Sequence, residues 1–288
     1  MSNAMGYSVA DMVTGAAVLS EVSESWRLDA QLLLAAAMQC SRESLLARPG
    51  QPLTDSQREK YEGTLQRRLQ GEPIAYILGR KGFWDFELAV DQRVLIPRPE
   101  TELLVELALA RLSGRENEKL TLADLGTGSG AIAIALARHS DQWQVTAIDK
   151  SSEALAVARH NAASLNLANI DFLQSSWCEN LQHARFDMIV SNPPYIAPSD
   201  PHLKKDGLAF EPDLALIAEA QGLADLSSIV MQTPGYLKNN AWLILEHGFQ
   251  QGEQVGEMLM ENGFADISLW QDLSGLDRVT ASRNVSKA

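Results

Sequence analysis

The stretch Asp124-Leu125-Gly126-Thr127-Gly128-Ser129-Gly130 joins a predicted strand, Leu120–Leu125, to a predicted helix, Ala131–His139. Glycines at such a turn let the backbone bend sharply and let a ligand approach without a Cβ atom in the way. In an open parallel sheet, the turn from a strand into its helix is where ligands bind. This stretch therefore predicts the first strand-turn-helix unit of a ligand-binding α/β domain.

Strands and helices continue to alternate after this turn. Predicted strands are Gln144–Asp149, Ile170–Gln174, Phe186–Ser191 and Ala241–His247, predicted helices are Ser152–Leu165 and Leu223–Leu237, and residues 250–281 add one more helix and two strands. Such alternation is typical of a mostly parallel, doubly wound sheet. We therefore predict an α/β fold for this part of the chain.

The pattern before this domain is different. Residues 8–70 have apolar positions at helical spacing, and Gly71-Glu72-Pro73 ends that run. Residues 84–90 alternate between apolar and polar, which is the period of a half-buried strand, and with Tyr76–Gly79 before them they suggest a β-hairpin. We expect a helical domain at 5–73, a hairpin linker at 74–97 and the α/β domain at 98–288.

Charge and composition argue against several classes of partner. The 288-residue chain has a net charge of −13 and two cysteines, Cys40 and Cys178, whose separation fits no metal-ligand spacing. Proteins that grip DNA usually present a cationic face, so the charge disfavours direct nucleic-acid binding. No apolar run is long enough to span a bilayer, and no signal peptide is present. We expect a cytoplasmic protein with reduced thiols and no metal.

The glycine-rich turn also indicates the cofactor. Dinucleotide enzymes use Gly-x-Gly-x-x-Gly over a pyrophosphate, whereas Gly-x-Gly-x-Gly after an acidic residue is the S-adenosylmethionine form. Asp149 ends the next predicted strand, where a carboxylate can accept hydrogen bonds from both ribose hydroxyls, or can cap the helix that follows. Trp177 follows the third strand and either covers the adenine ring or packs in the core.

The tetrapeptide Asn192-Pro193-Pro194-Tyr195 follows the buried strand Phe186–Ser191 directly. Two prolines forbid further helix or sheet and make a rigid turn at the end of that strand. The side-chain oxygen of Asn192 and the backbone carbonyl of Pro193 can each accept one N–H of an NH₂ group, and Tyr195 can pack flat on a conjugated group. The motif predicts methyl transfer to the nitrogen of a planar, conjugated group such as an amide.

The chain resembles the HemK/PrmC family, the N5-glutamine methyltransferases of peptide chain release factors. The resemblance covers the chain from Met5 onward and rests on motifs in this order: Gly71-Glu72-Pro73, Leu95 to Glu102, Asp124 to Gly130, Asn192 to Tyr195, Phe210-Glu211-Pro212 and Glu246-His247-Gly248. It implies a seven-stranded, Rossmann-like class I methyltransferase domain behind a helical domain that helps to dock the substrate. The implied acceptor is the glutamine of the Gly-Gly-Gln loop in class-1 release factors.

The resemblance also implies site residues. The catalytic residues are Asn192, Pro193 and Tyr195, and with Pro194 they hold the substrate glutamine. Arg98 and Thr101 are candidates for the pocket wall, or they order the interdomain turn and cap a helix. S-adenosyl-L-methionine, which leaves as S-adenosyl-L-homocysteine, is expected to contact Gly126, Thr127, Gly128, Ser129, Gly130, Asp149, Trp177 and Asn192.

The sequence departs from the usual family pattern in two places. Ser176 stands where many relatives have an acidic residue, and Ala218-Glu219-Ala220 stands where many have a glycine pair.

An adenine-N6 methyltransferase acting on DNA or RNA would use the same tetrapeptide on a flipped base, but the acidic balance disfavours it. A scaffold without turnover is disfavoured by the intact acceptor motif. We expect a monomer.

Overall fold

The computed structural model describes residues 7–182, 185–204 and 207–285, and these residues form two compact units. One unit contains the described residues up to Gly79 together with the segment Lys204–Phe210, and the other contains Arg80–Leu203 and the chain from Glu211 onward. In the described ranges, no helix has both the length and the apolarity needed to cross a membrane.

The first unit is helical, as the spacing of its apolar residues predicts. Leu33, Leu34 and Tyr61 are fully buried in its core, and burial of such side chains is the main source of stability for a small bundle. Its helices are α1 (Val9–Gly15), η1 (Ala16–Glu21), α2 (Trp26–Met38), α3 (Arg42–Leu46), α4 (Asp55–Leu69) and α5 (Ile74–Leu78).

A segment from much later in the chain completes this unit. It includes the short helix η3 (Leu208–Phe210). A Cβ atom on Gly207 would lie only 2.9 Å from Cγ of Pro73, and one on Gly71 would lie 3.5 Å from the ring of Phe210. The Gly71-Glu72-Pro73 motif therefore packs against residues that the sequence places between two strands of the other unit.

The β-hairpin begins later than predicted. The predicted first arm, Tyr76–Gly79, lies in α5 and in its cap Gly79, which has a φ of +71°. Trp84, predicted within the second arm, instead occupies the turn with a φ of +56°. The paired strands are β1 (Arg80–Phe83) and β2 (Phe86–Ala89). The prediction of the first arm was wrong because a short apolar run fits a helix as well as a strand, and the left-handed glycine at its end favours the helix.

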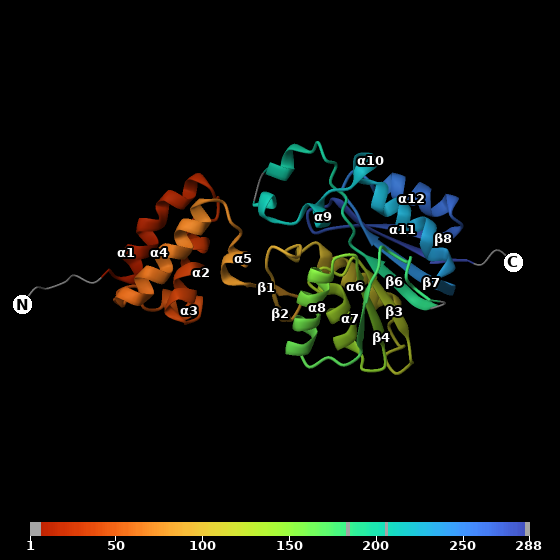
Figure 1. Cartoon of the computed structure of the whole chain (residues 1–288), viewed down its shortest axis with the longest axis horizontal. Coiled ribbons are helices and arrows are strands. Elements are labelled where there is room, and N and C mark those ends of the chain that lie inside the picture. The colour runs from red at the N-terminus through yellow and green to blue at the C-terminus, as the bar shows by residue number, and fades with distance from the viewer. Residues whose placement is uncertain (1–6, 183–184, 205–206, 286–288) are drawn as a thin grey trace, which may run out of the picture. The chain divides into compact units, whose positions relative to one another are not determined.

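The second unit is built on a seven-stranded sheet in the order β5-β4-β3-β6-β7-β9-β8 (Figure 1). The strands β5, β4, β3, β6 and β7 run parallel, and β9 pairs antiparallel with both β7 and β8. The predicted doubly wound α/β fold is confirmed. The strands are β3 (Thr121–Leu125), β4 (Gln144–Asp149), β5 (Ile170–Gln174), β6 (Phe186–Ser191), β7 (Leu237–Glu246), β8 (Phe264–Gln271) and β9 (Asp277–Asn284).

Helices cover both faces of this sheet. Figure 1 shows α11 and α12 on one side of the strands and α6, α7 and α8 on the other. Leu226, Ile229 and Leu259 from α11 and α12 pack against alternate residues of the central strands. The helices are α6 (Thr101–Arg111), α7 (Ala131–His139), α8 (Ser152–Ser164), η2 (Pro201–Lys204), α9 (Asp213–Leu216), α10 (Glu219–Gly222), α11 (Ala224–Gln232), η4 (Thr233–Gly235) and α12 (Gly252–Glu261).

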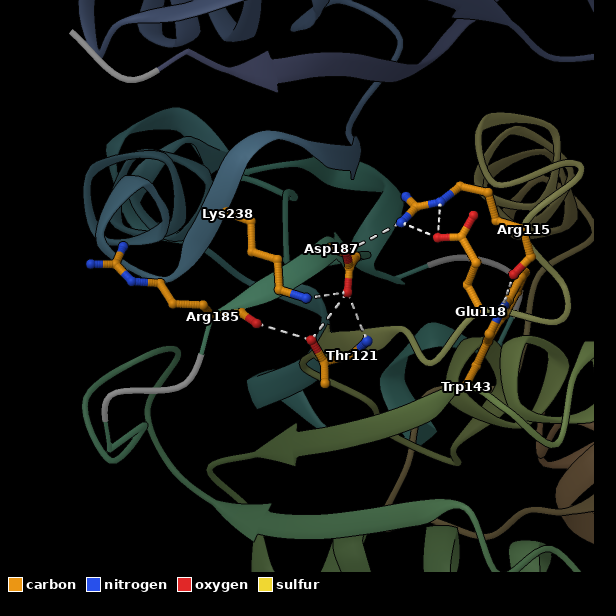
Figure 2. Close-up of polar contacts among 7 residues, drawn as sticks. All are labelled: Arg115, Glu118, Thr121, Trp143, Arg185, Asp187 and Lys238. Atoms are coloured by element: carbon orange, nitrogen blue, oxygen red, sulfur yellow. Dashed lines mark hydrogen bonds and ion pairs between the residues drawn. The ribbon is translucent and has the colours of Figure 1, made fainter. Parts of the chain in front are cut away.

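A polar network joins three strands at the amino end of the sheet (Figure 2). Asp187, near the start of β6, accepts hydrogen bonds from the backbone N–H of Thr121 on β3 at 2.9 Å and from Nζ of Lys238 on β7 at 2.6 Å. Arg115 lies 3.6 Å from its other oxygen. Burial raises the pKa of Asp187, but Lys238, Thr121 and Arg115 together outweigh it, so the pKa lies below its usual value.

Candidate active site

A cavity opens at the carboxyl ends of the central strands of the second unit. Its empty volume is about 910 Å³, part of it open to solvent. The strand order changes direction between β3 and β6, and ligands bind at such a switch point. Residues that end or follow four neighbouring strands line the cavity, namely Gly126, Gly128, Asp149, Ser175, Trp177, Asn192 and Pro194.

The turn after β3 leaves room for a ligand on one side and close packing on the other. Gly126, Gly128 and Gly130 have φ values of +76°, +55° and +87°, a region that favours glycine. A Cβ atom on Gly128 would meet nothing within 4 Å, whereas one on Gly130 would lie 3.1 Å from Ile134 and 3.2 Å from Ala158. Gly128 therefore lies open beside the cavity, and Gly130 allows α7 to pack closely against α8.

Asp124 holds this turn from inside. Its Oδ2 atom accepts hydrogen bonds from the Thr127 hydroxyl at 2.6 Å and from the Ala133 N–H at 3.1 Å. Its Oδ1 atom has no hydrogen-bond partner among the described residues. Burial raises the pKa of Asp124 to about 7, opposed by these two hydrogen bonds and reinforced by Asp149. Ser129 is buried in the same turn, where its carbonyl accepts from the side-chain amide of Asn161 at 2.9 Å.

Asp149 lies at the cavity wall, where both predicted roles can be compared. Its two oxygens accept from the Ser151 N–H at 2.9 Å and the Gly128 N–H at 3.0 Å. The N-cap residue of α8 is Ser151, whose hydroxyl accepts from the Ala154 N–H, so Asp149 is not the cap itself. Burial raises the pKa of Asp149, and the backbone hydrogen bonds oppose that shift. Each carboxylate oxygen keeps a lone pair for a ligand hydroxyl.

Trp177 combines the two alternatives that the sequence left open. It lines the cavity and also packs against the core cluster of the second unit. A Cβ atom on Gly126 would lie 3.3 Å from its ring, so a side chain at this position would press against the indole. Burial raises the pKa of Asp225 in the first turn of α11, and Lys150 and the nearby indole oppose that shift. The sequence offered no signal for Asp225, since the contact joins segments far apart in the chain.

The predicted acceptor tetrapeptide is divided between cavity and interior. Asn192 and Pro194 line the cavity, and the Asn192 side-chain nitrogen donates to the Thr101 hydroxyl at 3.0 Å. Pro193, between them in the sequence, is buried and is not among the lining residues. Tyr195 is packed against the core cluster, and its hydroxyl donates to Oε1 of Glu246 at 3.2 Å. Burial, reinforced by the negative charge of Glu246, raises the pKa of Tyr195 well above its usual value.

The backbone of Tyr195 is enclosed by the segment after α9. Its carbonyl accepts from Nε2 of Gln251 at 3.1 Å, and a Cβ atom on Gly222 would lie 2.1 Å from the same oxygen. Just before that glycine, Ala220 and Gln221 have φ values of +52° and +59°. Alanine and glutamine therefore adopt a backbone conformation here that favours glycine.

Arg98 and Thr101 differ in their relation to the cavity. Arg98 forms an ion pair with Glu211, whose second oxygen accepts from the Ile96 N–H at 3.0 Å. Pro212, the next residue, lines the cavity, so Arg98 supports the wall from behind. Thr101 is buried at the first position of α6 and contacts Asn192.

Several cavity residues were missed by the sequence-based interpretation. They lie in loops, at the start of α8 and in α9, and their side chains are ordinary in type, so only the folded arrangement reveals them. Those missed are Gln92, Arg93, Val94, Lys150, Ser151, Glu153, Ala154, Ser175, Leu214 and Ala215. Leu95 and Pro212 also line the cavity, and both belong to motifs quoted above.

The chain is similar to known protein families and to named proteins from several bacteria. A family described as "PrmC N-terminal domain" matches residues 13–79, and one described as "Methyltransferase small domain" matches residues 100–205. The release factor glutamine methyltransferase of Coxiella burnetii is 44% identical over 92% of this chain and 94% of that protein. The protein of the same name from Pseudomonas aeruginosa is 48% identical over 90% of this chain and 92% of its own.

A solved structure resembles the fold at lower identity. The ribosomal protein L11 methylase of Lactobacillus delbrueckii subsp. bulgaricus superposes with a TM-score of 0.50 at 23% identity, over 67% of this chain and 82% of that one. At this identity the likeness concerns the arrangement of strands and helices alone.

Proposed function

The chain belongs to the release factor glutamine methyltransferase family, and on this premise we propose its reaction in detail. It transfers a methyl group from S-adenosyl-L-methionine to N5 of the glutamine in the Gly-Gly-Gln motif of class-1 peptide chain release factors. One structural observation supports the proposal most directly. The side-chain amide of Asn192 lies in the wall of a cavity whose neighbouring wall is the turn around Gly128.

The cavity residues fit S-adenosylmethionine. Asp149 has lone pairs left for the two ribose hydroxyls, and Gly128 leaves space where a Cβ would protrude. The indole of Trp177 offers a flat apolar face for the adenine ring. The carboxylate of Asp149 provides negative charge in the cavity wall that suits a cationic ligand. When bound, the cofactor supplies a methyl group activated by a positively charged sulfur.

Asn192 and Pro193 would hold the acceptor amide. An amide nitrogen is a weak nucleophile because its lone pair is delocalised into the carbonyl group. Two acceptors, the Asn192 side-chain oxygen and the Pro193 carbonyl, bind its two N–H groups and orient the lone pair toward the methyl group. No strong base is needed, since the nitrogen becomes acidic only as it gains positive charge. Tyr195 supports the turn through its hydrogen bond to Glu246.

The proposed substrate also suggests which unit docks it and where in the cell the protein acts. We assign docking of the release factor to the helical unit and methyl transfer to the second unit. Since the substrate acts in translation, we place the protein in the cytoplasm. The net charge of −13 supports a protein substrate rather than DNA or RNA, and we propose a monomer.

Labelled cofactor tests this proposal. The wild-type protein is incubated with a release factor, with duplex DNA or with RNA, and products are analysed by peptide mass spectrometry. One added methyl on the Gly-Gly-Gln glutamine is expected, and label found only in nucleic acid would contradict the proposal. Asn192→Ala should lose transfer by at least about 100-fold, whereas the exposed Asn262→Ala should retain it. Full activity of Asn192→Ala would reject the role of that side chain.

A further inference from the structure

A buried carboxyl lies directly beside the acceptor motif. Leu245 on β7 pairs with Ser191 on β6, so the next residues in register are Glu246 and Asn192. Glu246 is fully buried and does not line the cavity. Burying a carboxyl group costs free energy unless its oxygens are hydrogen-bonded. Glu246 is therefore a candidate for a role in the function of the acceptor motif.

Two hydroxyl groups lie near this carboxyl. The hydroxyl of Tyr195, the last residue of the tetrapeptide, donates to Oε1 at 3.2 Å. The hydroxyl of Thr101, at the start of α6, lies close enough to the carboxyl to interact with it. Oε2 is buried and has no hydrogen-bond partner among the described residues, so we assign it the nearby Thr101 hydroxyl as its donor.

The Thr101 hydroxyl connects Glu246 to Asn192. A hydroxyl has one hydrogen to donate and two lone pairs with which to accept. When the hydrogen points to Glu246, the Thr101 oxygen can only accept from the other side. The Asn192 side-chain nitrogen supplies that hydrogen bond at 3.0 Å. The Asn192 oxygen is then the atom left for a ligand in the cavity.

We propose that Glu246, through Thr101, is a positioning residue that sets the orientation of the Asn192 side-chain amide and anchors Tyr195 at the other end of the tetrapeptide. This inference rests on the proposed function, in which the Asn192 oxygen accepts an N–H of the substrate amide. A reversed Asn192 amide would present its NH₂ group to the NH₂ group of the substrate, where two donors face each other and neither has an acceptor.

Substitutions at Thr101 test this relay. Thr101→Val keeps the shape and removes the hydroxyl, so kcat should fall by about 100-fold, which is the loss expected from misplacing one group by about 1 Å. The Kd for S-adenosylmethionine should stay within about twofold. Thr101→Ser keeps the hydroxyl and should restore most of the activity. Thr233→Val is the matched control, because Thr233 is equally buried and lies in η4.

A double-mutant cycle separates positioning from general packing. If Thr101 acts only through Asn192, adding Thr101→Val to Asn192→Ala should cause no further loss of kcat. A second loss of similar size on the Asn192→Ala background would overturn the inference, as would wild-type kcat in Thr101→Val. A crystal structure of Thr101→Val should show the Asn192 side chain rotated or in two orientations, and an unchanged side chain would also count against it.

The outcome can be distinguished from failure of the proposed function. The wild-type protein is first assayed on a release factor, with the methylated atom located by mass spectrometry. If no glutamine is methylated, the proposed function fails, whatever the variants do. If glutamine is methylated and Thr101→Val matches the wild type, only the positioning role of Glu246 and Thr101 is lost.

Discussion

Nζ of Lys238 lies 2.6 Å from Oδ2 of Asp187 and fastens β7 to β6 at the end of the sheet opposite the cavity. Asp187 also accepts from the Thr121 N–H on β3. The carboxylate therefore joins three adjacent strands, and its loss should loosen them without touching the cavity.

Asp187→Asn should lower the free energy of unfolding by about 1–2 kcal/mol, a modest loss because Lys238 is 44% exposed and partly screened by solvent. The pKa of Asp187 is lowered in the fold, so its contribution is present above the pKa of the unfolded chain and is lost as the pH falls further. Urea unfolding at neutral and acidic pH measures both effects. The exposed Asp141→Asn is the control. Equal stability of the two variants would contradict the prediction.

Asp149→Ala should weaken binding of S-adenosylmethionine by about 10- to 100-fold, because two charge-assisted hydrogen bonds to the ribose are lost. The pKa of Asp149 is raised by burial, so the carboxylate becomes protonated more readily as the pH falls. Wild-type affinity should therefore decrease toward acidic pH, and the variant should show less of this dependence. Calorimetric titration checks this, with the exposed Asp171→Ala on β5 as control.

Ala220→Gly should stabilise the protein by about 0.5–1 kcal/mol. Ala220 has a φ of +52°, where an alanine pays a steric penalty that a glycine does not. Ala163→Gly in α8 is the opposite control, since a right-handed helix favours alanine and the change should cost about 0.5–1 kcal/mol. Thermal unfolding of both variants gives the comparison. A loss of stability in Ala220→Gly would show that this segment is not strained.

Gly222→Ala should disturb the acceptor motif while leaving the cofactor site in place. The added Cβ would lie 2.1 Å from the Tyr195 carbonyl oxygen, so the tetrapeptide must move. We expect kcat to fall by at least about tenfold with little change in cofactor affinity. Gly275→Ala is the matched control, because Gly275 has a similar positive φ and open space around it. Unchanged turnover in Gly222→Ala would contradict the prediction.

Glu246 should make turnover depend on pH. Burial raises its pKa to about 7, opposed by Thr101, Arg278 and Tyr195 and reinforced by Glu100. A protonated carboxyl can donate to the Thr101 hydroxyl and no longer dictates the orientation of Asn192. At saturating cofactor, kcat should rise between about pH 6 and about pH 8 in the wild type. Glu246→Gln should have a flatter profile, and an identical profile would remove this role.

The carboxyl of Glu246 should make the free energy of unfolding change with pH in the opposite direction to the carboxyl of Asp187. Glu246 keeps its proton in the fold at pH values where the unfolded chain has released it, so the free energy of unfolding should decrease as the pH rises from about 4.5 to about 7. Asp124, whose pKa burial raises to about 7, contributes with the same sign. Denaturant unfolding of wild type and Glu246→Gln across this range measures the difference, and parallel curves would contradict it.

The parts of the site that local sequence determines were predicted well. The turn from Asp124 to Gly130 and the end of β6 at Ser191 lie where the sequence placed them, because glycine and proline spacing act within a few residues. The contact of Tyr195 with Glu246 could not be predicted, since it depends on the pairing of β6 with β7. The hairpin arm failed for a related reason: a five-residue apolar run does not distinguish helix from strand.

Because the segment Lys204–Phe210 belongs to the helical unit, a single cleavage of the chain does not separate the two units. The chain passes between them at 79–80, again at 203–204 and a third time at 210–211. Cleavage at the first junction alone would leave Lys204–Phe210 on the larger fragment, in noncovalent contact with the helices of the smaller one. A fragment beginning at Arg80 would carry Phe210 without the glycine it packs on, so the helical unit is completed by a segment from later in the chain.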